Sequence, residues 1–217
     1  MRDALAARTL LILIIFAIAF GVEEAIIVLY LRQLPPNSHL TGTAAATVGL
    51  AQQIIHLETA RELCTLIILG TVAWLATANP ADRIRAFLVA FGAWDITYYV
   101  AMFALSGSPQ ITSQDVLFLI PIPWIGPVRA AMSFAFALIL IGAFGIERRR
   151  TPALVAGLLL GWLSFVLEPF KALYLGHGGA VPQAQSMPYP VWLFVPAILL
   201  VAAALRWPTA NATPAGE

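Results

Sequence analysis

Six long apolar stretches, separated by short turn-like segments, dominate this sequence of 217 residues. An α-helix needs about 20 consecutive apolar residues to cross the hydrocarbon layer of a bilayer. Backbone polar groups within lipid must be paired inside the crossing segment, so such stretches form helices. The spans predicted on this basis are residues 9–31, 43–78, 84–105, 127–146, 152–175 and 191–207.

Composition supports the same class of fold. Hydrophobic residues make up 60% of the chain and charged residues only 11%, whereas soluble domains average about 25% charged residues. We therefore predict an all-α polytopic integral membrane protein with six transmembrane helices in a single domain, 1–207, followed by a short disordered tail, 208–217. The first apolar stretch continues to Leu31, which favours an uncleaved helix over a signal peptide.

The charged residues predict the binding partner of the chain and its orientation in the membrane. The net charge of +1 and the scattered basic residues exclude a nucleic-acid interface and leave the lipid bilayer as the expected partner. Basic residues near span ends gather on the cytoplasmic side. Most basic residues near span ends lie on one side of the predicted spans, and on the opposite side only Arg32 lies close to a span end. We therefore expect the N- and C-termini on the cytoplasmic side of a cell membrane. The basic residues of the cytoplasmic side are Arg2, Arg8, Arg83, Arg85, Arg148, Arg149, Arg150 and Arg206.

The segment DVLFLIPIPWIGP, residues 115–127, interrupts the pattern of helices. Its three prolines and one glycine cannot form a continuous spanning helix. A re-entrant or interfacial segment on the outer face, with Trp124 at the level of the headgroups, fits these residues. The alternatives are a plain loop that caps the fourth span and a lid over whatever lies beneath it.

The stretch HLETARE, residues 56–62, places four ionisable side chains inside a predicted span. Each charge at mid-bilayer costs about 2.5–3.5 kcal/mol on insertion scales, so these side chains should face the protein interior and one another. The ionisable residues within all predicted spans are Glu23, Glu24, His56, Glu58, Arg61, Glu62, Asp95, Arg129, Glu168 and Lys171.

The acids of the spans are expected to gather in one layer. At a rise of about 1.5 Å per residue, four spans place an acid between the midplane and the outer boundary: Glu23, Glu62, Asp95 and Glu168. Six acids face three permanent cations, so three acids must be protonated, hydrated in a cavity or neutralised by a bound cation. We predict a shared pocket that opens toward the extracytoplasmic side.

Helical spacing refines the content of this pocket. Glu58, Arg61 and Glu62 share one face of a helix, whereas His56 lies on another side unless the helix is distorted. Glu168 and Lys171 are spaced for a local ion pair. Carboxylates with one histidine suit a divalent metal such as iron, manganese, zinc or magnesium.

These arguments assign residues to roles. The predicted metal ligands are Glu24, His56, Glu58, Glu62, Asp95 and Glu168. The predicted catalytic residues are Glu58, Arg61, Asp95 and Tyr98. The residues predicted to balance charge or to hold an anionic substrate group are Arg61, Arg129 and Lys171.

Known families of membrane metalloenzymes have motifs that differ from this sequence. The EExxxR motif of intramembrane CAAX-type proteases is not present, because Arg32 follows Glu24 by eight residues. Histidine-rich desaturases need many more than the three histidines of this chain. WDITYY, residues 94–99, and the segment 115–127 look similar to segments of uncharacterised bacterial membrane proteins. That resemblance indicates a bacterial inner membrane and implies no activity.

Three function classes stay open on the sequence. The preferred one is a membrane metalloenzyme that acts on a lipid-soluble or small substrate. A proton-coupled or cation transporter would use the surplus carboxylates as a relay, although inner halves of spans such as FLVAFGA, residues 87–93, are apolar. In a structural or assembly subunit, the buried charges would only fix the packing of the helices.

Overall fold

The computed structural model describes residues 5–33, 43–107, 109–145, 150–174 and 188–205. Within them, six helices and one hairpin follow in this order: α1 (Ala7–Gln33), α2 (Thr43–Ala76), α3 (Pro80–Ser106), β1 (Gln114–Phe118), β2 (Trp124–Pro127), α4 (Val128–Phe144), α5 (Thr151–Tyr174) and α7 (Val191–Ala204). The predicted helical class is confirmed, and each helix corresponds to a predicted span. The predicted tail at 208–217 lies outside the described residues.

Within the described part of the chain, four helices are long and apolar enough to cross a membrane: Ala7–Tyr30, His56–Ala76, Pro80–Ser106 and Thr151–Lys171. The helices α4 and α7 are also apolar, but they have 17 and 14 residues. Both are shorter than the roughly 20 residues that a straight crossing needs. The chain therefore has the helices of a membrane protein, and the count of six spans and the cytoplasmic termini stay predictions.

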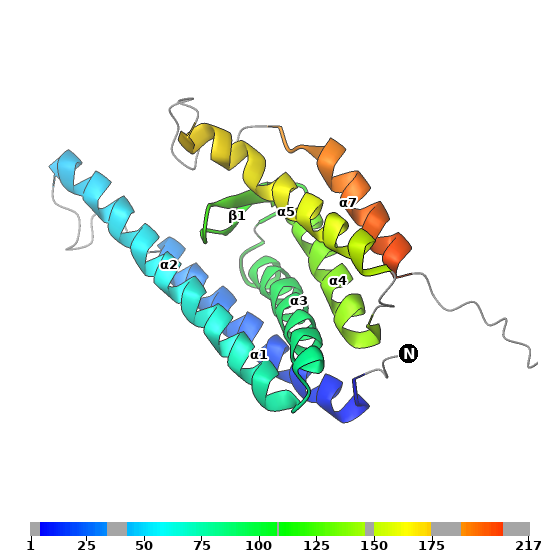
Figure 1. Ribbon diagram of the computed structural model, residues 1–217. Coiled ribbons are helices and arrows are strands. Elements are labelled where there is room, and N and C mark those ends of the chain that lie inside the picture. Colours follow the sequence, from blue (N-terminus) through cyan, green and yellow to red (C-terminus); the bar gives the residue numbers. More distant parts are fainter. Residues whose placement is uncertain (1–4, 34–42, 108, 146–149, 175–187, 206–217) are drawn as a thin grey trace, which may run out of the picture.

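Helix α3 packs against α1, α2 and α4, and α5 pairs with α7 (Figure 1). Local signals fix both ends of α3. The Asn79 side chain accepts a hydrogen bond from the Ala81 N–H at 3.1 Å, and Pro80 occupies the first turn. At the other end Gly107 has a φ of 68° and its N–H donates to the Phe103 carbonyl at 2.7 Å.

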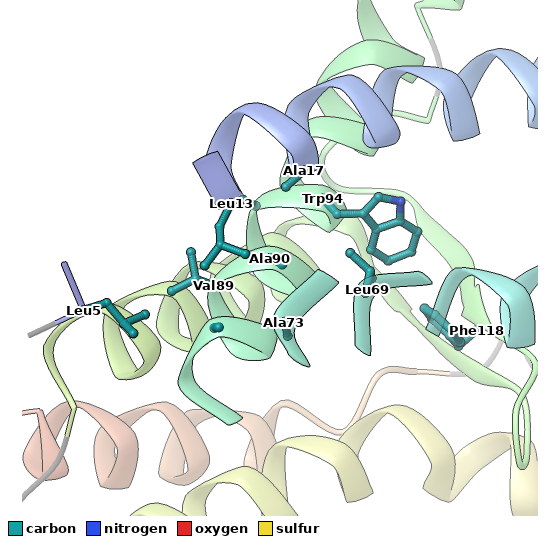
Figure 2. Close-up of a cluster of buried hydrophobic side chains, with 11 residues drawn as sticks. Leu5, Leu13, Ala17, Leu69, Ala73, Val89, Ala90, Trp94 and Phe118 are labelled. Carbon is teal, nitrogen blue, oxygen red and sulfur yellow. The ribbon is translucent and has the colours of Figure 1, made fainter. Parts of the chain in front are cut away.

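The main apolar core lies where α1, α2, α3 and β1 meet (Figure 2). Its labelled members are Leu5, Leu13, Ala17, Leu69, Ala73, Val89, Ala90, Trp94 and Phe118. Lipid is as apolar as these side chains, so helices in a membrane associate through close packing rather than through escape from water. Small residues permit that packing. A Cβ atom at Gly21 would lie 2.7 Å from the Trp94 carbonyl oxygen, and one at Gly142 would lie 2.5 Å from that of Arg85.

Residues 115–127 are not helical, as their prolines predicted, but they belong to an antiparallel hairpin that the all-α prediction did not include. Gln114 pairs with Pro127 and Phe118 with Trp124, with a change of register between Val116 and Phe118. The connecting turn holds two of the prolines, where no ladder hydrogen bond is needed from their nitrogens.

The hairpin lies between two groups of helices. Phe118 of β1 belongs to the core shared with α1, α2 and α3. On the other strand, a Cβ atom at Gly126 would lie 2.7 Å from the Phe165 ring, so β2 lies directly against α5. The hairpin therefore connects the packing of α1–α3 with that of α5. Its predicted re-entrant or interfacial place in a membrane stays a prediction.

Candidate functional site

A cavity of about 520 Å³ lies where α1, α2, α3 and the hairpin meet. Its ionisable and aromatic lining residues are Glu58, Arg61, Glu62, Trp94, Asp95, Tyr98, Asp115 and Phe118. The predicted shared pocket is therefore present, but its acids come from α2, α3 and the hairpin rather than from four spans. Glu24 of α1 contacts this group through Arg61.

Arg61 joins carboxylates from two helices. Its Nε donates to Oε2 of Glu58 at 2.8 Å, which confirms the pair expected from helical spacing. Its Nη1 forms an ion pair with Glu24 on α1. The Thr65 hydroxyl lies 3.1 Å from Oε1 of Glu24 and 3.1 Å from the Arg61 carbonyl oxygen. The positive charge of Arg61 is therefore shared between two carboxylates.

Glu24 and its neighbour in the sequence have opposite environments. Glu24 is 3% exposed, whereas Glu23 is exposed at the surface of the bundle. Adjacent residues of a helix point about 100° apart, so one of two consecutive acids faces away when the other is buried. The structure brings Glu24 to Arg61 and leaves Glu23 outside the cluster.

Glu62 holds the hairpin against α2. It is 7% exposed, and its Oε2 accepts a hydrogen bond from the Leu119 N–H at 2.8 Å. Leu119 directly follows β1 and also lines the cavity. A hydrogen bond to an ionised acceptor is stronger than one between neutral groups. This carboxylate therefore fixes the end of β1 at one wall of the cavity.

Asp95 is the acid of the cavity lining that has no hydrogen-bond or ion-pair partner among the described residues. Protein surrounds it, and part of its surface stays accessible because it lines the cavity. Among the described residues, Asp95 forms no hydrogen bond and no ion pair. Arg61, the basic group of the cavity lining, is engaged with Glu24 and Glu58. Asp95 is thus a carboxylate of the cavity that is available to a ligand.

Aromatic residues share the cavity lining with Asp95. Trp94 and Tyr98 lie one turn apart on α3, with ring centroids 6.3 Å apart and an interplanar angle of 27°. Phe118 approaches Trp94 edge-on, with centroids 6.0 Å apart. All three rings line the cavity. The site therefore combines carboxylates with aromatic walls.

Five residues of the predicted site do not line the cavity: Glu24, which contacts it through Arg61, and His56, Arg129, Glu168 and Lys171. His56 is exposed, as the angular spacing of the helix suggested. Arg129, at the start of α4, is also exposed. Glu168 and Lys171 form their expected local ion pair on α5, with 2.7 Å between Oε1 and Nζ. The prediction that all these residues share one site is corrected. Glu168 and Lys171 of α5 lie outside the cavity, and α4 contributes no group to the lining.

Two polar residues of the site were not among the predicted ones. Thr65 is a neutral residue four positions after Arg61, and its spacing was the signal that could have placed it on the same face. Asp115 begins the proline-rich segment and lines the cavity, and its carboxylate accepts a hydrogen bond from the Val116 N–H at 3.0 Å. Its part in the site depends on the fold of the hairpin.

The carboxylates of the cavity do not converge as metal ligands do. Across the described part of the chain, no group of three or more His, Cys, Asp or Glu side chains has an arrangement that could hold a metal ion. The reason is visible in the contacts, since Glu24 and Glu58 bind Arg61, and Glu62 accepts from Leu119. Two further predicted ligands, His56 and Glu168, lie outside the cavity.

No protein-family model, curated protein or solved structure matches this chain, so the residues of the cavity are the basis for the functions considered below.

Proposed function

We propose that this chain is an integral membrane protein that binds a small cation in its acidic cavity, with Asp95 as the charged anchor. The observation that carries the proposal is the environment of Asp95. It is enclosed by protein, lines a cavity of about 520 Å³ and has no ion-pair partner among the described residues.

A carboxyl group in the interior of a membrane protein must be protonated, hydrated or paired with a cation. The two nearby cation–carboxylate contacts are already formed by Arg61. Three further carboxylates line the same cavity, namely Glu58, Glu62 and Asp115, and they lower its electrostatic potential. Exchange between a proton and a cation on one carboxylate is the basis of coupled transport, so a cation transporter is the activity that this arrangement fits best.

The direct test is equilibrium binding by the purified protein in lipid nanodiscs. Sodium, potassium, magnesium, manganese and tetramethylammonium chloride are added in turn at constant ionic strength, and binding is followed by calorimetry. We expect at least one of these cations to bind wild type and to lose binding at least tenfold in Asp95→Asn. Glu168→Gln is the matched control, because that carboxylate is paired with Lys171 outside the cavity. Failure of all five cations to bind would refute the proposal.

Transport and the other function classes have separate readouts. Flux of the bound cation into proteoliposomes, lost in Asp95→Asn, would assign transport. A metalloenzyme requires a stoichiometric metal in elemental analysis that decreases in Glu62→Ala, and the donor arrangement described above gives that hypothesis no support. A structural subunit would bind no cation and would respond to the same substitutions only in its stability.

A further inference from the structure

We propose that the cation held by this cavity is a small organic ammonium ion rather than an inorganic ion, an inference that rests on the proposed function. Three features support it: the size of the cavity, its aromatic walls and the position of Asp95, which has no partner among the described residues.

The size of the cavity fits an organic ligand. Pockets for small organic molecules are typically about 300–1,000 Å³ in volume, and this one has about 520 Å³. A bare calcium or magnesium ion instead needs six to eight oxygen ligands at about 2.0–2.6 Å, converging on one point. The acids of the described residues do not converge in that way. An inorganic ion at Asp95 would therefore leave most of this space unfilled.

The walls of the cavity fit an organic cation. Trp94 and Tyr98 stack on each other one turn apart on α3, next to Asp95, and Phe118 of β1 contacts Trp94 edge-on. The faces of aromatic rings attract ammonium groups, and more strongly where water is excluded. Alkyl groups on the nitrogen would contact the rings and the apolar lining residues Val28 and Val116.

The contacts of the cavity leave Asp95 available to a positive group. Arg61 is held by Glu24 and Glu58, so its charge is compensated before a ligand enters. Glu62 is committed to the Leu119 N–H. Asp95 is the carboxylate that can accept hydrogen bonds from an ammonium N–H or pair with a quaternary ammonium. One cation of this kind would neutralise the charge of Asp95.

The test compares organic and inorganic cations on the full chain in phosphatidylcholine nanodiscs. Calorimetric titrations use tetramethylammonium, n-butylammonium, sodium, potassium and magnesium chlorides at matched ionic strength. We expect one ammonium ion to bind per protein, with the inorganic ions at least tenfold weaker. Asp95→Asn should weaken ammonium binding at least tenfold.

Aromatic variants separate a cation–π contribution from a general loss of packing. Tyr98→Leu should bind roughly 3- to 30-fold more weakly than Tyr98→Phe, which keeps the ring. Phe103→Leu is the control, because Phe103 is an exposed aromatic residue of α3 that does not line the cavity.

The outcomes distinguish the inference of an ammonium ligand from the proposed function of cation binding. Binding of inorganic cations in preference to both ammonium ions, with dependence on Asp95, would overturn the inference and leave the proposed function standing. Equal affinity of Tyr98→Leu and Tyr98→Phe would also overturn it, because the rings would then contribute nothing. Absence of binding by every cation tested would overturn both.

Discussion

Arg61 contacts Glu58 on its own helix and Glu24 on α1. The sequence predicts the first contact but not the second. The first follows from a spacing of three residues within one helix, which the sequence displays. The second joins residues 37 positions apart and depends on how α1 and α2 are rotated about their axes. Glu62 was expected on the same charged face as Arg61, but its carboxylate contacts the hairpin instead.

Replacement of Arg61 by methionine should destabilise the protein. Removal of one member of a buried ion pair costs about 3–5 kcal/mol, and the lower end applies because the Arg61 side chain is 21% exposed. Unfolding in mixed micelles of dodecyl sulfate and dodecyl maltoside measures the change. The double variant Glu24→Gln with Arg61→Met should recover part of the lost stability, because Glu24 then no longer leaves an unpaired buried charge. The neutral amide can still accept from the Thr65 hydroxyl. No recovery would contradict the assigned Glu24–Arg61 pair.

At the scale of elements, the hairpin was the feature that hydropathy did not predict. The prolines of residues 115–127 correctly excluded a helix, but strand pairing depends on contacts with α2, α3 and α5. The Glu62–Leu119 hydrogen bond is one of these contacts and joins the hairpin to α2.

Substitution of Glu62 should release the end of β1. Leucine at this position leaves the Leu119 N–H without its acceptor, and an unsatisfied buried donor costs about 1–3 kcal/mol. Hydrogen exchange of peptides covering 115–120 should therefore become roughly tenfold faster in Glu62→Leu. Glu62→Gln is the matched control, since its carbonyl oxygen can still accept, and its exchange should resemble wild type. Unchanged exchange in Glu62→Leu would show that this bond does not hold the hairpin.

The contact between α3 and α4 should depend on Gly142. A Cβ atom there would lie 2.5 Å from the Arg85 carbonyl oxygen, so the two backbones must separate to admit it. Overpacking of this kind costs about 1–3 kcal/mol, and Gly142→Ala should lower the midpoint of dodecyl sulfate unfolding. Gly70→Ala is the control, because no atom lies within 4 Å of its added Cβ. Equal stability of the two variants would contradict the close approach of α3 and α4.

At the scale of the whole molecule, α3 is central, with α1, α2 and α4 packed around it (Figure 1). The cavity lies in the half of this bundle that contains the hairpin, away from the turn at Asn79 between α2 and α3. If the basic residues orient the chain as predicted, the Asn79 turn is cytoplasmic and the cavity opens toward the extracytoplasmic side.

Cysteine labelling tests this orientation. Cys64 is the single native cysteine, so Cys64→Ala provides the background. A membrane-impermeant maleimide should label Gln110→Cys in intact cells and should label Asn79→Cys only after the membrane is permeabilised. Both positions are exposed in the structure. The reverse pattern would place the cavity on the cytoplasmic side.

The sequence by itself determined that the chain forms apolar helices, where most of them begin, that residues 115–127 are not helical, and which local ion pairs form. These features depend on hydropathy and on contacts within a few residues. Only the tertiary structure decided which acids share the cavity. The helices carry apolar residues on their outer as well as their inner faces, as exposed Leu11, Ile12 and Ile15 on α1 illustrate. Apolar side chains are as stable against lipid as in the protein core. The pattern of hydrophobic residues therefore does not show which side of each helix is buried in the protein. The rotation of each helix about its own axis places Glu24 beside Arg61 and Glu62 beside the hairpin, and it leaves Asp95 without a partner among the described residues.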